Sequence, residues 1–156
     1  MPDPGRPRRR GRFHGSTVRG PRRRGVVGVI VQTDRLLVIR RSLTVRAPGM
    51  HCFPGGGLEP GESEPDALVR EMHEELNIAT RPVERLWESD TRSGVRLGWW
   101  LTELLSPDLL QANPAEVAEI HWLPVADILA LETLLDTNRR FFEAWTAGHF
   151  ELPLPR

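Results

Sequence analysis

FPGGGLEPGESEPDALVREMHEELNI, residues 53–78, joins a glycine-rich loop to a helix that carries both an apolar face and an acidic face. We expect this helix to begin after Ser63, a good N-cap residue, with Pro65 in its first turn, and to end near Leu76. At about 100° per residue, apolar residues gather on one side and glutamates on a neighbouring side. The apolar set is Leu68, Val69, Met72 and Leu76, and the acidic set is Glu71, Glu74 and Glu75.

The acidic face is unfavourable on its own. Its three glutamates lie at i, i+3 and i+4, where like charges repel, and in the helix half where the dipole disfavours anions. An acidic helical face is most often only a solvated surface. The preceding Pro54-Gly55-Gly56-Gly57 favours a different interpretation, because glycine lets the backbone approach an ion or a phosphate closely. Loop and glutamates together predict a site for Mg²⁺ or Mn²⁺, with substrate phosphate completing the ligand shell.

The same residues resemble the signature of the Nudix hydrolase superfamily, Gly-x5-Glu-x7-Arg-Glu-U-x-Glu-Glu-x-Gly-U, where U is bulky and apolar. Its positions fall here on Gly56, Glu62, Arg70-Glu71-Met72, Glu74-Glu75 and Ile78. Asn77 replaces the last glycine, and asparagine is the non-glycine residue that best tolerates a left-handed helix cap. The resemblance covers 23 residues, Gly56 to Ile78.

The resemblance implies an α/β fold, a Nudix-type α/β/α sandwich with a mixed sheet between helices. It also implies metal-dependent hydrolysis of a nucleoside diphosphate linked to another moiety, by attack of water on phosphorus. By position in the signature, Glu71, Glu74 and Glu75 are the expected metal ligands and catalytic carboxylates, assisted by a carbonyl of Gly55 or Gly56. Arg70 is expected to pair with Glu62 and brace the carboxylates, and Glu59 is a possible outer ligand.

Similar proteins often recruit a further acid outside this signature as metal ligand or general base. Glu116 and Glu119 are the candidates here, and the alternative is a charged sheet edge. Arg40 and Arg41 end a predicted strand, where they either hold a substrate phosphate or simply meet solvent. Arg41-Ser42 and Phe53-Pro54-Gly55-Gly56 are also similar to coenzyme A pyrophosphatases, with a shorter and altered segment between them.

The remaining pattern predicts further strands and two helices. Predicted strands are Val26–Val31, Leu36–Ile39, Pro82–Glu88, Val95–Leu104 and Glu116–Pro124. Predicted helices are Val125–Leu131 and Leu135–Trp145. A tight turn at Thr33-Asp34 is expected to join the first two strands, whose continuous apolar character indicates burial on both faces.

Length and composition indicate one domain, residues 25–156, in a chain of 156 residues with 39% hydrophobic content. No apolar run is long enough to span a bilayer, so we expect no membrane contact. The only cysteine, Cys52, excludes an internal disulfide, and a reducing cytoplasm is the simplest setting. We expect Cys52 to be a small buried residue rather than a nucleophile. His51 either lines the site or, as is more common for a histidine, is structural. We expect the protein to be a monomer or homodimer that acts on a nucleotide-type small molecule.

Residues 1–24 form a separate segment with nine arginines and one acid. It nearly lacks aliphatic residues, so we expect a disordered arm that makes at most a weak contact with nucleic acid or another polyanion. A solvated tail, or a start codon upstream of the real one, is the alternative. Two other functions therefore stay open: an RNA-binding or RNA-processing Nudix protein that uses the arm, and a catalytically silent ligand-binding module on the same fold.

Overall fold

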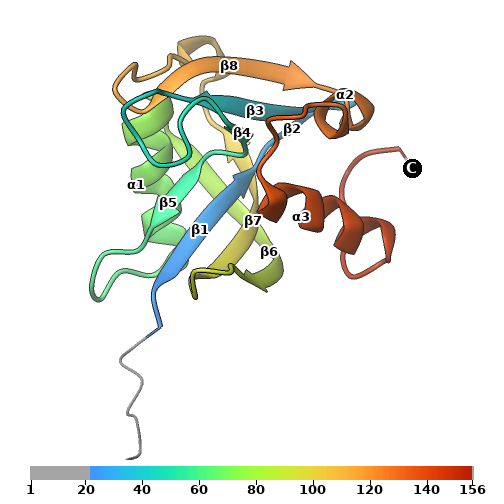
Figure 1. Cartoon of the computed structure of the whole chain (residues 1–156). Coiled ribbons are helices and arrows are strands. Elements are labelled where there is room, and N and C mark those ends of the chain that lie inside the picture. The colour runs from blue at the N-terminus through green and yellow to red at the C-terminus, as the bar shows by residue number, and fades with distance from the viewer. Residues whose placement is uncertain (1–21, 156) are drawn as a thin grey trace, which may run out of the picture.

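The computed structural model describes residues 22–155, in which two sheets lie between helices (Figure 1). The strands are β1 Arg24–Val29, β2 Val31–Gln32, β3 Arg35–Arg41, β4 His51–Cys52, β5 Gly55–Gly57, β6 Thr80–Asp90, β7 Arg96–Leu104 and β8 Val117–Leu123. The helices are α1 Glu64–Leu76, α2 Val125–Leu129 and α3 Asp136–Thr146, with a short 3₁₀ turn at Pro107–Leu109. This is the α/β architecture with a mixed sheet that the sequence predicts.

The first sheet has the strand order β5-β1-β7-β6 and is mixed, because β1 and β7 run parallel while the other pairs are antiparallel. The second sheet is antiparallel and centred on β3. β8 pairs with one edge of β3 along its length, and β2 and β4 pair with β3 at its two ends. The predicted single run Val26–Val31 is thus divided at Ile30, and only its last part forms the hairpin with β3.

Burial on both faces of the strands explains their continuous apolar sequence. Val26 packs in a core cluster with α1, whereas Val27 and Val29 pack in a second cluster with α3. On the α1 face, Gly28 lets the helix approach closely, because a Cβ there would lie 3.3 Å from Leu68 Cδ1. In Figure 1, α1 and α3 lie on opposite sides of β1.

Several details differ from the sequence predictions, and most are shifts of one or two residues at the ends of elements. Val69 is 39% exposed and does not join Leu68, Met72 and Leu76 in the core, because it lies one position off the buried stripe. α2 ends at Leu129 rather than Leu131. β1 begins at Arg24 rather than Gly25. Residues 1–21 of the predicted arm lie outside the described residues.

Among residues 22–155, no helix combines the length and the apolar character that crossing a bilayer requires.

Candidate metal and substrate site

Helix α1 begins and ends as its sequence predicts, which fixes where its glutamates lie. The Ser63 hydroxyl accepts a hydrogen bond from the Asp66 N–H at 3.2 Å. Asn77 closes the helix in the left-handed conformation, with φ 53° and ψ 36°. Glu71, Glu74 and Glu75 therefore occupy the last turns, on the side of the helix that faces β5 and the segment before β8.

Three carboxylates converge at this end of α1. Glu71, Glu74 and Glu116 each offer a carboxylate oxygen, and these oxygens lie within 4.8 Å of one another. Glu71 is 9% exposed, whereas the Glu74 side chain is 43% exposed. The structure thus brings one of the two acids predicted from outside the signature, Glu116, to the signature glutamates.

Asn113 positions Glu116, and the sequence analysis missed it. Its N–H donates to the Glu75 carbonyl at 2.9 Å, and its side-chain amide donates to the Glu74 carbonyl at 3.1 Å. These bonds satisfy carbonyls that the end of a helix leaves without intrahelical partners. Glu116 then returns its N–H to the Asn113 carbonyl at 3.0 Å. The turn-forming dipeptide Asn113-Pro114 was the available signal.

Glu75 and Glu71 are buried acids whose charge is incompletely compensated. Glu75 is 6% exposed and accepts one bond from the Gly55 N–H at 3.3 Å. Burial, with the nearby charge of Glu71, raises the pKa of Glu75 well above its ordinary value. Burial also raises the pKa of Glu71, although Arg70 opposes the shift. A hard divalent cation would stabilise both carboxylates, so this donor set fits Mg²⁺ or Mn²⁺.

Arg70 connects the acidic residues. Its guanidinium donates to Glu62 at 2.8 and 2.9 Å, to Glu71 at 3.0 Å and to Glu74 at 3.2 Å. The pairing with Glu62 is the one expected from the sequence, and these bonds lower the pKa of Glu62 to about 2. Glu59 is more peripheral, since its side chain is 66% exposed and its carboxylate lies 3.8 Å from Arg70 Nε.

The glycine loop leaves no room for side chains at two positions. A Cβ at Gly55 would lie 2.1 Å from the Val26 carbonyl oxygen of the neighbouring strand. A Cβ at Gly56 would lie 2.3 Å from the Glu71 carboxylate carbon. The loop backbone therefore passes directly against Glu71.

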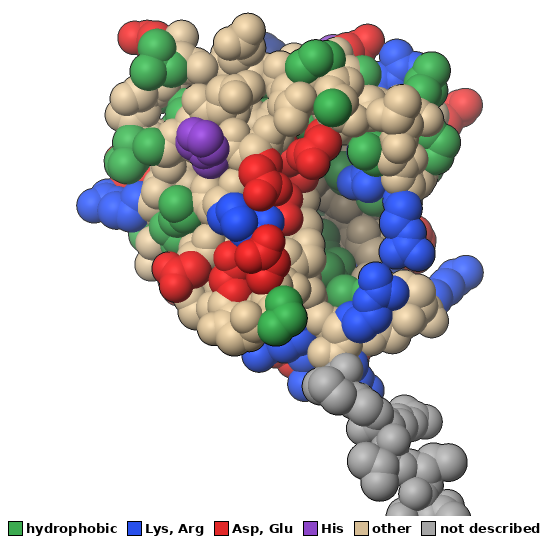
Figure 2. All heavy atoms as spheres, turned by 90° about the vertical axis from the view of Figure 1, so that its left-hand side faces the viewer, with side chains coloured by type: hydrophobic (Ala, Val, Ile, Leu, Met, Phe, Trp, Pro, Cys, Tyr) green, Lys and Arg blue, Asp and Glu red, His purple; other side chains and the backbone are tan. Residues whose placement is uncertain are grey.

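A cavity of about 560 Å³ opens beside this loop. Its basic lining is Arg23, Arg24, Arg41 and Arg46, and its apolar lining includes Phe53, Leu58, Val95 and Leu97. Figure 2 shows a patch of acidic side chains beside a hollow in the surface, with basic side chains along the other side of the hollow.

The two candidate arginines are separated by the structure. Arg41 lines the cavity, whereas Arg40 pairs with Glu119 at 3.2 Å on β8, and neither partner belongs to the cavity lining or the convergent acids. Trp99 is fully buried, and Trp100 donates its indole N–H to Glu64 at 3.0 Å. Trp100 also packs, partly buried, against the core cluster that contains α1.

Comparison with known proteins places residues 21–145 within the family described as NUDIX domain. The chain is 39% identical over 112 residues to the uncharacterized Nudix hydrolase NudL of Photorhabdus laumondii, covering 67% of this chain and 60% of that protein. It is 31% identical over 131 residues to human mitochondrial coenzyme A diphosphatase NUDT8, covering 77% of this chain and 52% of that protein. The chain thus spans little more than half the length of these relatives.

The solution structure of the Escherichia coli ORF135 protein superimposes with a TM-score of 0.65 at 28% identity, covering 80% of this chain and 89% of that one.

Proposed function

This chain belongs to the Nudix hydrolase family, and we propose that it is a metal-dependent hydrolase that cleaves the pyrophosphate bond of a nucleoside diphosphate linked to another moiety. One observation carries the proposal: Glu71, Glu74 and Glu116 converge within 4.8 Å beside a cavity lined by arginines. Such an arrangement pairs oxygen ligands for a cation with positive charge for a polyanionic substrate.

We assign the metal to Glu71, Glu74, Glu75 and Glu116, with a backbone carbonyl of Gly55 or Gly56. When bound, a divalent cation neutralises phosphate oxygens and makes a coordinated water more acidic. Glu59 is an outer ligand in this scheme, held near the site by Arg70. The burial of Glu71 and Glu75 supports the assignment, because it raises the pKa of both carboxyls and a bound cation would stabilise their ionised forms.

The protein's own residues position the reactants. Arg70 orients Glu71 and Glu74 through its bonds to both, and Glu62 anchors Arg70 from the other side. Arg41 and Arg46 contact the diphosphate from the cavity wall. Leu58, Val95 and Leu97 pack against the nucleoside and exclude water.

The substrate that we place first is a coenzyme A-type diphosphate. Four arginines line the cavity, which suits a substrate with a phosphate beyond the diphosphate itself. The similarity to coenzyme A diphosphatase NUDT8 supports the same choice.

The decisive experiment is a Mg²⁺-dependent screen for phosphate-containing products across coenzyme A, nucleotide sugars, dNTPs, dinucleoside polyphosphates and capped RNA. We expect hydrolysis of coenzyme A, and a loss of turnover by orders of magnitude in Glu74→Gln and Glu75→Gln, with both variants still folded. Wild-type turnover in both variants would refute the site. Binding of a ligand without formation of any product would instead indicate a catalytically silent ligand-binding module.

Arg41→Gln and Arg40→Gln together test whether the cavity binds the substrate. The first is expected to raise KM for the chosen substrate roughly tenfold or more, since it removes a charged contact. The second leaves KM near the wild-type value, because Arg40 does not line the cavity.

The basic arm favours RNA as a second substrate class. Deleting residues 1–21 tests it without disturbing β1, which begins at Arg24. A fall in RNA affinity and in its salt dependence would support RNA contact through residues 1–21, whereas unchanged values would exclude that contact.

A further inference from the structure

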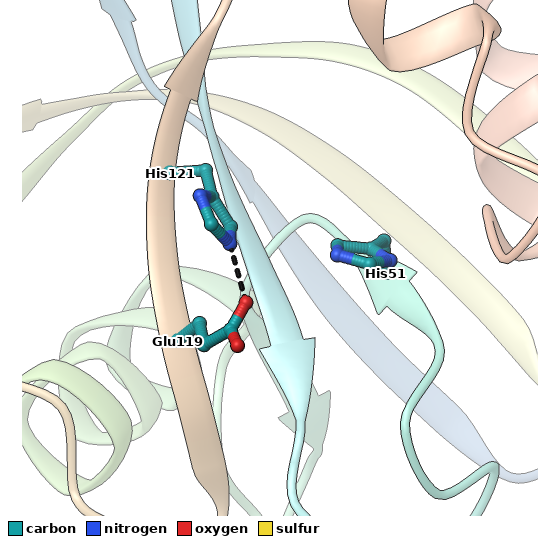
Figure 3. A group of neighbouring side chains, drawn as sticks. All are labelled: His51, Glu119 and His121. Carbon is teal, nitrogen blue, oxygen red and sulfur yellow. Dashed lines mark hydrogen bonds and ion pairs between the residues drawn. The ribbon is translucent and has the colours of Figure 1, made fainter.

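A second group of metal-ligand side chains lies outside the acidic site. His51, Glu119 and His121 each offer a ligand atom, and these atoms lie within 4.8 Å of one another. His121 Nε2 lies 2.7 Å from Glu119 Oε2, and the two histidine rings are 5.9 Å apart between centroids. Figure 3 shows His121 and Glu119 on one strand and His51 on another, with β3 between them.

The register of the second sheet places these residues on one face. Arg40 on β3 pairs across the strands with His51 on one side and with Glu119 on the other. His121 lies two residues beyond Glu119 and therefore points to the same face. The grouping thus follows from backbone pairing and not from the chance position of long surface side chains.

We propose that His51, Glu119 and His121 form a second cation site, selective for a borderline transition metal such as Zn²⁺. Two imidazoles and one carboxylate are zinc ligands, whereas Mg²⁺ prefers oxygen alone. Three protein ligands leave one tetrahedral position for water.

Thr133 supplies the supporting contact that such a histidine needs. His51 Nδ1 lies 2.6 Å from the Thr133 hydroxyl. In the tautomer in which Nδ1 donates to this hydroxyl, Nε2 carries the free lone pair. The His51 backbone is also fixed, because its N–H donates to the Thr133 carbonyl at 2.8 Å. Orientation of a ligating ring through its other nitrogen typically changes metal affinity by about 10- to 100-fold.

Arg40 opposes cation binding, so replacing it should increase the affinity for Zn²⁺. Its guanidinium holds Glu119 Oε1 at 3.2 Å, which leaves Oε2 on the His121 side. The same positive charge repels an incoming cation. Arg40→Gln is therefore expected to bind Zn²⁺ several-fold more tightly than the wild type.

A metal at this second site would connect the glycine loop to Glu116, both of which belong to the acidic site. β4, which carries His51, leads through Phe53 and Pro54 into the glycine loop. β8, which carries Glu119 and His121, directly follows Glu116. A metal held between β4 and β8 would tie these two segments together.

The test is Zn²⁺ titration of the full chain in millimolar Mg²⁺, which competes for oxygen-only sites, followed by ¹⁵N NMR of the imidazoles. We expect the ring-nitrogen resonances of His51 and His121 to move together at one equivalent of Zn²⁺, and Co²⁺ to give visible absorption. His51→Ala and His121→Ala should each weaken Zn²⁺ binding by about tenfold or more, and Thr133→Val by roughly tenfold.

His149→Ala is the matched control, because His149 is an exposed histidine after α3, and it should bind Zn²⁺ as the wild type does. Unmoved His51 and His121 resonances in the wild type would overturn the proposal. Wild-type Zn²⁺ affinity in both histidine variants would do the same, since the metal would then lie on other ligands. The NMR measurement needs no substitution, so poor folding of a variant cannot obscure the result.

Discussion

Gly56 and Glu71 lie so close that a Cβ on residue 56 would be 2.3 Å from the Glu71 carboxylate carbon. The glycine at this position is therefore required by the side chain opposite, and its backbone freedom is secondary. This contact ties the loop to the helix across the proposed metal site.

Gly56→Ala should displace the Glu71 carboxylate. A displacement of about 1 Å in an active site can cost about 10²-fold in rate, and we expect a loss of this size in kcat/KM. Gly57→Ala is the matched control, because the nearest atom to its added Cβ is 3.9 Å away, at the Arg24 carbonyl. Steady-state kinetics of the two variants test the contact, and equal rates would contradict it.

Glu75→Gln should stabilise the metal-free protein. Burial raises the pKa of Glu75 above its ordinary 4.5, so the folded state holds a proton that the unfolded chain releases. The contribution of this group to unfolding free energy is thus largest below pH 4.5 and declines as pH rises toward the folded pKa. Removing the charge should flatten that decline and raise Tm by a few degrees at neutral pH.

Urea denaturation of wild type and Glu75→Gln between pH 5 and pH 8 measures this difference. Adding Mg²⁺ should stabilise the wild type more than the variant, because the variant lacks the Glu75 carboxylate as a metal ligand. A variant that is less stable than the wild type at every pH would show that the buried charge is already compensated.

The sequence predicted the local features of α1 because each depends on neighbouring residues. The Ser63 cap and the Asn77 left-handed end lie at the two ends of the helix. The Arg70–Glu62 pair was expected from the resemblance to the Nudix signature, and the structure contains it. The sequence did not predict which outside acid joins the site. Glu116 and Glu119 are three residues apart, and only the docking of Asn113 on the helix end and the register of β8 on β3 separate them.

The division of the first apolar run between two sheets also could not be predicted from the run itself, because it depends on long-range strand pairing. Val26–Val31 looks like one strand from its composition. Strand partners decide the break at Ile30, since β1 pairs with β5 and β7 while β2 pairs with β3. Long-range pairing leaves no signal in the run itself.

Asn113→Ala should destabilise the protein and weaken metal binding together. It removes the amide bond to the Glu74 carbonyl, worth about 1 kcal/mol, and loosens the turn that holds Glu116. We expect several-fold weaker Mn²⁺ binding by calorimetry. Gln111→Ala is the control, because Gln111 docks on the helix end through its backbone N–H. Unchanged Mn²⁺ affinity in Asn113→Ala would separate Glu116 from the metal site.

Glu64 anchors the N-terminal end of α1. The stability of the protein should therefore fall when its charge is removed or when the space for its carboxylate is filled. Its carboxylate accepts bonds from Arg24 at 2.5 Å, Arg85 at 3.0 Å and the Trp100 indole at 3.0 Å. A Cβ at Gly98 would lie 1.7 Å from Glu64 Oε1. Glu64→Gln and Gly98→Ala should each lower stability by roughly 1–3 kcal/mol.

The Glu64 effect should depend on pH. Burial opposes ionisation, but the Arg85 and Trp100 bonds outweigh it, so the pKa of Glu64 lies below its ordinary 4.5. Its stabilisation is therefore present above pH 4.5 and lost as pH falls through the folded pKa. The stability difference between wild type and Glu64→Gln should shrink in acid; a gap that widens there would contradict this account.

Cys52 should resist thiol reagents in the native protein. It is 4% exposed, and burial raises its pKa to about 11, although Arg41 donates to its sulfur at 3.9 Å and opposes the shift. Because the thiolate is the reactive form, the lower ionised fraction alone should slow modification at pH 8 by about 10²-fold relative to the unfolded chain. Reaction with a disulfide reagent in buffer and in urea measures the ratio. Equally fast labelling in both would mean that β4 opens readily, which would also weaken the case for His51 as a fixed ligand.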